Sequence, residues 1–289
     1  MIERKFNICY LVFLLILIVY FLLDTFVITK VYEVVSKDDG YENKSSDITI
    51  MDNYYKDDNI EITIKEYREY DSNIYVADVY LNDSKYLQTA FAKDSYGKNV
   101  TEKTSTIASN NNAILAINGD YYGVQEKGFV LRNGTVYRNT SSGKDALVIY
   151  KDGSFEVINE DDTLLEDLLN NGAYNVLSFG PVLVEDNLVS VTENDEVDRA
   201  MASNPRTSIG IIDENHYVFV VSDGRVSESA GLSLYDLATF MKNLGCKIAY
   251  NLDGGGSSTM YFNGEIINNP TTNGKISERS VSDIVYIGY

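Results

Sequence analysis

The chain has 289 residues, with 24 lysines and arginines against 43 aspartates and glutamates, so its net charge is −19. Such an acidic chain is not expected to bind nucleic acid, whose phosphate backbone would repel it. A single histidine and two cysteines exclude a zinc site built from several histidines, so acid–base chemistry is expected to fall to carboxylates.

The N-terminus is expected to lie outside the folded core. Arg4 and Lys5 precede an almost unbroken apolar run of 18 residues, which suits a helix that crosses a membrane. The alternative, a cleaved secretory signal, lacks a small-residue cleavage site. We predict a cytoplasmic N-terminus (1–5), a transmembrane signal anchor (6–28) and a polar acidic stalk (29–60). Basic residues before the span place the bulk of this single-pass chain on the extracytoplasmic side of the cell membrane.

Residues 61–289 are predicted to form one α+β domain with a mixed, mostly antiparallel sheet. Alternating apolar residues separated by turn residues indicate five hairpins. Their turns are Asp71-Ser72-Asn73, Asn133-Gly134, Asp152-Gly153, Asp213-Glu214-Asn215 and Asn263-Gly264. Short helices are predicted over 104–111 and 162–171.

A strand-helix-strand crossover is predicted late in the chain. The first strand ends at Asp223, Ser233 and Asp236 form a capping box for the helix, and the second strand ends at Asp253. Such a connection joins parallel strands. We therefore expect both aspartates at the same edge of the sheet, where ligands commonly bind.

The stretch Asn251-Leu252-Asp253-Gly254-Gly255-Gly256-Ser257-Ser258-Thr259 is the most informative part of the sequence. Three successive glycines cost backbone entropy, so an ordered chain needs a reason to keep them. One reason is the close approach of backbone N–H groups to an anion; the alternative is a flexible loop. Arg206, which follows the rigid Asn204-Pro205, suits a carboxylate or a phosphate.

Five motifs resemble, in their order and approximate spacing, those of the phosphodiester glycosidase family. They are Ala116-Ile117-Asn118-Gly119, Phe179-Gly180-Pro181, Asn204-Pro205-Arg206-Thr207, Asp223-Gly224-Arg225 and Asn251–Thr259, and Glu278-Arg279 follows them. The resemblance covers residues 74–289. It implies an extracytoplasmic hydrolase that cleaves the bond between the anomeric carbon of a sugar and a phosphodiester, in surface polysaccharide or glycopolymer metabolism such as that of exopolysaccharide.

The resemblance implies catalytic roles for Asp253, Arg206 and Asp223. Because the leaving group is a weakly basic phosphate monoester, the site needs an anion cradle and one carboxylate that acts as nucleophile or activates water. The residues implied to bind substrate are Asn118, Gly119, Thr207, Arg225, Gly254, Gly255, Gly256, Ser257, Ser258 and Arg279. Asp120 departs from the family pattern, and a local cap, a metal-binding acid and a second carboxylate stay open for it.

No cofactor is required by this interpretation, and no metal ligands are assigned. A divalent cation such as calcium would suit so many acids, but no spaced ligand set supports it. The expected partners are a sugar-phosphate or glycopolymer substrate and, through the N-terminal helix, the membrane. The alternative function is a non-catalytic phosphoglycan-binding module anchored at the cell surface.

Overall fold

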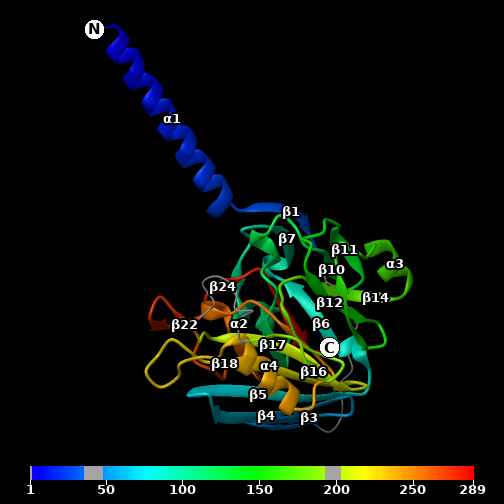
Figure 1. Cartoon of the computed structure of the whole chain (residues 1–289). Coiled ribbons are helices and arrows are strands. Elements are labelled where there is room, and N and C mark those ends of the chain that lie inside the picture. Colours follow the sequence, from blue (N-terminus) through cyan, green and yellow to red (C-terminus); the bar gives the residue numbers. More distant parts are fainter. Residues whose placement is uncertain (1, 36–47, 193–202) are drawn as a thin grey trace.

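The computed structural model describes residues 2–35, 48–192 and 203–289 (Figure 1). Its largest sheet has nine strands. In spatial order they are β16 (Leu188–Val189), β15 (Val182–Glu185), β19 (Ile248–Asn251), β17 (Arg206–Asp213), β18 (His216–Ser222), β5 (Ser72–Leu81), β4 (Ile60–Glu69), β3 (Tyr54–Lys56) and β2 (Thr49–Met51). All neighbouring strands of this sheet pair antiparallel.

Two five-stranded sheets complete the domain. The first contains, in spatial order, β21 (Glu265–Ile266), β20 (Met260–Phe262), β9 (Leu115–Asn118), β25 (Asp283–Ile287) and β6 (Leu87–Phe91). The second contains β11 (Thr135–Arg138), β10 (Val130–Arg132), β14 (Ala173–Leu177), β12 (Asp145–Tyr150) and β13 (Phe155–Asn159). Three small pairs are β1 (Lys30–Val34) with β7 (Ser95–Lys98), β8 (Glu102–Lys103) with β24 (Ser280–Val281), and β22 (Thr271–Thr272) with β23 (Lys275–Ile276).

Helices are few and, within the domain, short. They are α1 (Ile2–Phe26), α2 (Thr104–Asn110), α3 (Leu165–Asn170) and α4 (Leu234–Asn243), with single 3₁₀ turns η1 (Ser84–Tyr86), η2 (Ala92–Asp94), η3 (Tyr122–Val124) and η5 (Gly255–Ser257). The predicted α+β class with mostly antiparallel strands is therefore confirmed. The five predicted hairpins also form, as β4–β5, β10–β11, β12–β13, β17–β18 and β20–β21.

The predicted crossover is present, with one difference. Strand β17 pairs antiparallel with both β18 and β19, so these two strands run parallel but are not neighbours. Helix α4 connects them and begins with the predicted capping box, in which Ser233 and Asp236 exchange hydrogen bonds. The buried face of α4, which includes Leu237 and Met241, packs on Val218 and Val220 of β18.

A common core joins the three large sheets. One cluster of buried side chains contains Phe219 and Tyr250 from the nine-stranded sheet, Ile117 from the first five-stranded sheet, and Leu147 and Leu177 from the second. Because this cluster lies between the sheets, the segments that pass from one sheet to another are fixed at both ends by buried strands. One of these segments carries the glycine-rich stretch.

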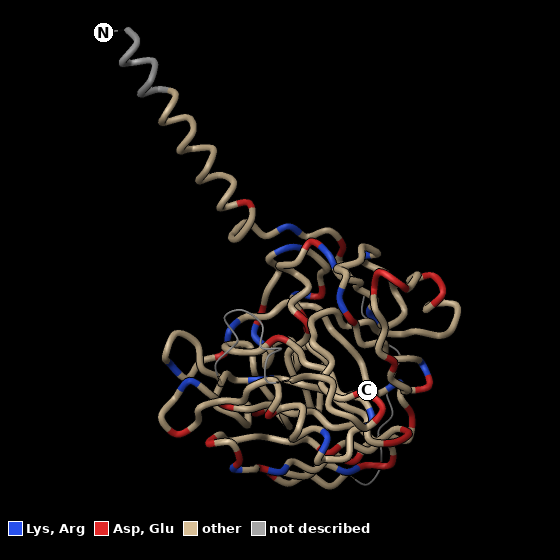
Figure 2. The backbone as a smooth tube through the Cα atoms, viewed as in Figure 1, with Lys and Arg blue, Asp and Glu red and all other residues tan. Residues whose placement is uncertain are grey.

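The N-terminal prediction needs correction. Helix α1 projects away from the domain (Figure 1). Among its described side chains, which begin at residue 10, the first charged one is Asp24, and it pairs with Lys30 at 2.7 Å. Figure 2 shows an acidic residue near the end of α1 that faces the domain. Within the part of the chain that the structure describes, no helix is both long enough and apolar enough to cross a membrane. The transmembrane helix predicted over residues 6–28 is therefore not supported.

The stalk predicted over residues 29–60 contains regular structure. Strand β1 pairs with β7, and Tyr32 packs against Tyr96 with ring centroids 5.8 Å apart. Strands β2 and β3 extend the nine-stranded sheet beyond β4. Sequence reasoning missed β2 and β3 because each has only three residues, and β1 because its partner β7 lies far along the chain. Residues 36–47 of the predicted stalk lie outside the described residues.

Candidate functional site

The glycine-rich stretch links two sheets. Strand β19 ends at Asn251 in the nine-stranded sheet, and β20 begins at Met260 in the first five-stranded sheet. Between them, Gly255 begins the 3₁₀ turn η5 and has a left-handed φ of 65°. The segment Asp253–Ser257, hereafter the glycine turn, is thus held between two buried strands, and the flexible-loop alternative is wrong.

Close packing explains the three glycines. A Cβ atom at Gly254 would lie 2.8 Å from the carbonyl oxygen of Pro205, and one at Gly256 would lie 2.7 Å from Thr272 Oγ1. The Gly255 amide donates to the same Pro205 oxygen at 2.8 Å. That amide is used by the fold, so the predicted cradle of three free glycine amides is wrong at its central residue.

The Asp253 side chain accepts two hydrogen bonds from residues predicted to belong to the site. Ser257 Oγ donates to Oδ2 at 2.6 Å, and Arg279 Nη2 donates to the same oxygen at 2.7 Å. Arg279 Nε also donates to Ser257 Oγ at 2.8 Å. Only 11% of the Asp253 side chain is exposed, against 40% of that of Arg279. The structure therefore joins these three residues into one cluster that is only partly exposed to solvent.

The surroundings of Asp253 act on its pKa in opposite directions. Burial raises the pKa of the carboxyl group, while the charge of Arg279 and the hydrogen bond from Ser257 lower it. Burial dominates, so the pKa lies above its ordinary value. A carboxylate with a raised pKa is a better proton acceptor than an exposed aspartate. This is the arrangement expected of a nucleophile or general base.

Asn118 and Thr207 hold the backbone of the glycine turn in place. Asn118 Nδ2 donates to the carbonyl oxygen of Asp253 at 2.6 Å, and Asn118 Oδ1 accepts from Thr207 Oγ1 at 2.8 Å. Gly119 accepts a backbone hydrogen bond from Asp253 at 3.2 Å. Asn118 and Thr207 are fully buried. The predicted contact of these two side chains with substrate is therefore replaced by contact with the protein.

Asp223 is also buried and is bound within the fold. Its Oδ1 accepts from Asn268 Nδ2 and from the backbone amide of Asn269, at 3.1 and 2.8 Å. Its Oδ2 accepts from Tyr75 and from Asn269 Nδ2, at 3.3 and 3.1 Å. Asn268 also donates to the carbonyl oxygen of Ser258. Asp223 thus positions the loop beside the glycine turn, although the sequence predicted a catalytic role for it.

Arg206 is 5% exposed, and its Nε donates to the carbonyl oxygen of Leu232 at 2.9 Å. Its guanidinium group therefore binds the loop before α4. Ser258 follows the glycine turn and is fully buried, and its hydroxyl has no hydrogen-bond partner in the described part of the chain. By contrast, Arg225 is exposed, and its Nε donates to Asn204 Oδ1 at 3.0 Å.

Two neighbours of the cluster have roles that the sequence did not settle. Tyr121, in a left-handed conformation with φ 66°, lies with its ring centroid 5.7 Å from the guanidinium carbon of Arg279. Tyr122 is buried and stacks on Tyr96. Of the pair, Tyr121 is the one that lies at the site, and Tyr122 belongs to the core.

Glu278, which precedes Arg279 in the last motif, contacts the first turn of α2. Its carboxylate accepts from the backbone amide of Ser105 at 3.0 Å and from the Ser105 hydroxyl at 2.6 Å. A carboxylate at a helix N-terminus satisfies a backbone donor that has no partner within the helix. Glu278 therefore fixes the segment that carries Arg279.

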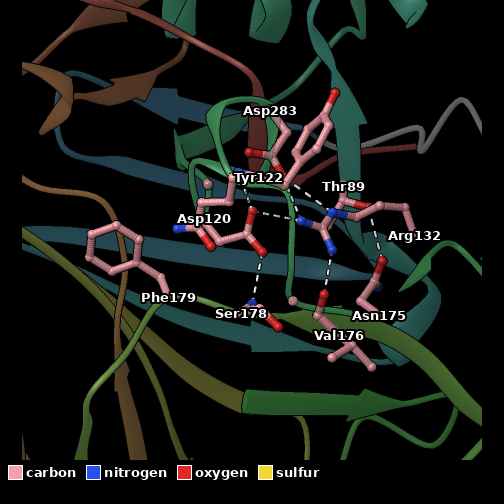
Figure 3. A network of polar contacts seen from close by, with 12 residues as sticks. Thr89, Asp120, Tyr122, Arg132, Asn175, Val176, Ser178, Phe179 and Asp283 are labelled. Carbon is pink, nitrogen blue, oxygen red and sulfur yellow. Dashed lines mark hydrogen bonds and ion pairs between the residues drawn. The ribbon is translucent and has the colours of Figure 1, made fainter. Parts of the chain in front are cut away.

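Asp120 belongs to a buried network next to the site (Figure 3). Arg132 Nη2 lies 2.9 Å from Asp120 Oδ1 and 2.8 Å from Asp283 Oδ2. Asp120 Oδ2 accepts from the backbone amide of Ser178 at 2.8 Å, and Arg132 Nη1 donates to the carbonyl oxygen of Val176. Of the three roles left open for Asp120, the structure supports a local structural one.

Two carboxylates share one guanidinium group in this network, so the charges do not balance. Burial and the charge of Asp120 raise the pKa of Asp283 to about 7, although Arg132 opposes them. Burial lowers the pKa of Arg132, but the two carboxylates raise it by more. Asp283 Oδ1 has no hydrogen-bond partner among the described residues. A proton on Asp283 would make the network neutral.

No group of three or more histidine, cysteine, aspartate or glutamate side chains in the described ranges is arranged to hold a metal ion. The site as described consists of one partly exposed carboxylate, two arginines that reach the surface, and a tyrosine ring. Sequence reasoning did not assign Asn268, Asn269, Arg132 or Asp283. Only Asn269 had a signal in the sequence, because it precedes Pro270, one of the three prolines of the chain.

Comparison with known proteins relates this chain to one family. A family model described as phosphodiester glycosidase matches residues 111–288. The SPbeta prophage-derived uncharacterized protein YomE of Bacillus subtilis is 28% identical over 200 residues, which are 67% of this chain and 31% of that protein. The mouse N-acetylglucosamine-1-phosphodiester alpha-N-acetylglucosaminidase is 36% identical over 66 residues, which are 23% of this chain and 13% of that enzyme. The chain thus spans less than a third of the length of either relative.

A solved structure resembles the whole fold. The catalytic domain of the zebrafish N-acetylglucosamine-1-phosphodiester alpha-N-acetylglucosaminidase, auto-inhibited by its pro-peptide, aligns with a TM-score of 0.64. The alignment covers 91% of this chain and 88% of that one, at 19% sequence identity. At this identity the match shows a common fold.

Proposed function

The chain belongs to the phosphodiester glycosidase family, and on that basis we propose that it hydrolyses the bond between the anomeric carbon of a sugar and a phosphodiester. The observation that carries the proposal is the geometry at Asp253. Its carboxylate is largely buried, is oriented by Ser257 and Arg279, and lies at a turn that three glycines bring close to neighbouring chain segments.

The chemistry needs one carboxylate of this kind. The bond between C1 and the phosphate oxygen breaks, and the phosphate monoester leaves with the electron pair of that bond. Because this leaving group is weakly basic, it needs less proton donation than the alcohol released from an ordinary glycoside. Asp253 either attacks C1, after which water hydrolyses the glycosyl ester, or removes a proton from the attacking water.

Burial of Asp253 supports this role. The carboxylate must be ionised to act, and Arg279 at 2.7 Å favours its ionised form. Burial raises its pKa and so increases its affinity for a proton or for an electron-poor carbon. Tyr121 beside Arg279 offers a ring face against which a sugar can pack.

The mouse and zebrafish relatives are named for a substrate in which N-acetylglucosamine is joined to a phosphodiester. We extend the general class of that substrate, a sugar-1-phosphodiester, to this chain. A role in surface polysaccharide or glycopolymer metabolism and the extracytoplasmic location are predictions from the sequence. The second candidate is a non-catalytic phosphoglycan-binding module. Such a module would need the arginines to bind phosphate, but it would not need the Asp253 carboxylate.

The proposal is tested with the purified full chain, UDP-N-acetylglucosamine and a panel of sugar-1-phosphodiesters, with the released reducing sugar followed by NMR. Release of sugar supports the hydrolase, and the first-formed anomer shows whether Asp253 acts as nucleophile or as base. Saturable binding of the same compounds without release across the panel would instead support the binding module.

A further inference from the structure

We propose that Arg225, and not Arg206, recognises the phosphate group of the substrate at this site. The inference rests on the proposed function, because it names the group that binds the anionic part of a sugar-1-phosphodiester. Three arginines, Arg206, Arg225 and Arg279, surround the glycine turn, and the sequence predicted the anion cradle at Arg206. Their contacts differ in a way that the sequence does not reveal.

Arg206 and Arg279 are already engaged by the protein. Arg206 is almost completely buried, and its Nε donates to the carbonyl oxygen of Leu232. Arg279 donates to Asp253, to Ser257 and to the carbonyl oxygen of Gly254. A phosphate that took either guanidinium group would therefore compete with existing hydrogen bonds, and at Arg279 it would leave the Asp253 carboxylate without its partner.

Arg225 is placed differently. Its side chain is exposed, and Nε is oriented by Asn204 Oδ1 at 3.0 Å. Within the described parts of the chain, Nη1 and Nη2 make no hydrogen bond or ion pair. The two terminal amino groups of Arg225 are therefore available to a ligand. The guanidinium group is planar and permanently charged, and the spacing of its N–H donors matches that of two phosphate oxygens.

The guanidinium group of Arg225 lies against the glycine turn, which also carries Asp253. A Cβ atom at Gly255 would lie 3.0 Å from Arg225 Nη2 and 3.2 Å from Nη1, so the missing side chain is what lets the guanidinium approach the backbone. Gly255 is two residues from Asp253. A phosphate on Arg225 would thus lie beside the carboxylate that acts on the neighbouring anomeric carbon.

The backbone of Arg225 is unfavourable for an arginine. Its φ is 63°, in the left-handed region, where glycine and asparagine are accepted more readily than arginine. The backbone amide donates to the carbonyl oxygen of Ala230 at 3.3 Å, which holds this conformation. Strain of this kind persists where the side chain serves a function that a better-suited residue could not.

The test compares the full chain with Arg225→Asn, because asparagine tolerates the left-handed backbone but carries no charge. Dissociation constants for UDP-N-acetylglucosamine and for N-acetylglucosamine are measured by calorimetry, with melting temperatures as a check on folding. Arg68→Gln removes an exposed positive charge on β4 and serves as the control. A conservative variant, Arg225→Lys, is expected to recover part of the binding because it restores the charge without the fork.

We expect Arg225→Asn to melt no earlier than the wild type and to bind UDP-N-acetylglucosamine about 10- to 100-fold more weakly, with binding of the neutral sugar unchanged. Unchanged binding of the nucleotide sugar, or equal losses for both ligands, would overturn the inference. Sugar release by the wild type separates the two hypotheses. If the wild type binds through Arg225 but releases no sugar, the proposed hydrolysis fails while Arg225 keeps its role.

Discussion

Arg279 binds both the side chain and the turn of Asp253: its Nη2 lies 2.7 Å from Asp253 Oδ2 and 3.2 Å from the carbonyl oxygen of Gly254. One guanidinium group therefore fixes the carboxylate and the backbone that carries it. Glu278, the residue before Arg279, binds α2 through hydrogen bonds from Ser105. The orientation of Asp253 thus depends on a segment that follows it by 26 residues.

The first prediction concerns the pH dependence of activity in Arg279→Gln. Arg279 lowers the pKa of Asp253, whereas burial raises it. Loss of the positive charge should therefore raise this pKa further. The acid limb of the kcat/KM profile, which reports the base of the free enzyme, should therefore move to higher pH. Arg279→Lys keeps the charge and should move the limb less. An acid limb of Arg279→Gln and of Arg279→Lys at the same pH as that of the wild type would contradict the assignment of Asp253 as the base.

The second prediction separates Asp223 from catalysis. Asp223→Asn replaces one carboxylate oxygen by an amide nitrogen, which in the place of Oδ2 cannot accept the hydrogen bonds from Tyr75 and from Asn269 Nδ2. The variant should lose about 1–3 kcal/mol of unfolding free energy, measured by urea denaturation. Its kcat, measured on folded protein, should fall far less than that of Asp253→Asn. Unchanged stability together with a complete loss of turnover would return Asp223 to the catalytic residues.

The third prediction concerns the buried pair of carboxylates at Arg132. The pKa of Asp283 is raised to about 7 from 3.8, so the folded protein holds a proton that the unfolded chain has lost. The stabilisation from this proton is complete below pH 4 and is lost as the pH rises toward and through about 7. Over that window it decreases by about 1.4 kcal/mol per pH unit.

Asp283→Asn should remove this contribution, because asparagine cannot titrate and leaves Asp120 and Arg132 as a neutral pair. Unfolding free energies of the variant and the wild type are measured at pH 5 and pH 8. We expect the wild type to lose more stability than the variant between the two values. Parallel losses in the two proteins would show that Asp283 does not hold the proton.

The sequence predicted the local elements of the fold well. Hairpins such as β4–β5 and β10–β11 were found because their turns and their alternating residues lie within a few positions of each other. The capping box of α4 is likewise a local signal. Strand β1 was missed because its partner β7 lies far along the chain, and β2 was missed because it has only three residues.

The site was predicted in part. Asp253, Ser257 and Arg279 come together as expected, since a glycine turn and a late arginine are recognisable in the sequence. Burial is a property of the folded chain, so the sequence did not show that Asp223 and Arg206 are bound by the protein. For the same reason the sequence-based assignment favoured Arg206 as the anion-binding arginine.

Asp120 illustrates the limit of sequence reasoning most clearly. Its partner Arg132 is near in the sequence, and Asp283 contacts the same Nη2 atom of that guanidinium group. Arg132 and Asp283 are 151 positions apart. No pattern in the sequence connects residues so distant. Arg132 lies on β10 of one five-stranded sheet and Asp283 on β25 of the other, and they meet only in the folded chain.

The central claim is that the Asp253 carboxylate performs the hydrolysis, and it is tested most directly by comparing Asp253→Asn with the wild type in turnover and in binding of the same sugar-1-phosphodiester. Asp213→Asn, which alters an exposed carboxylate paired with Lys247, is the control. We predict that kcat of Asp253→Asn falls by about 100- to 10,000-fold, while the dissociation constant and the melting temperature stay near those of the wild type. Turnover by Asp253→Asn at the rate of the control would contradict the account.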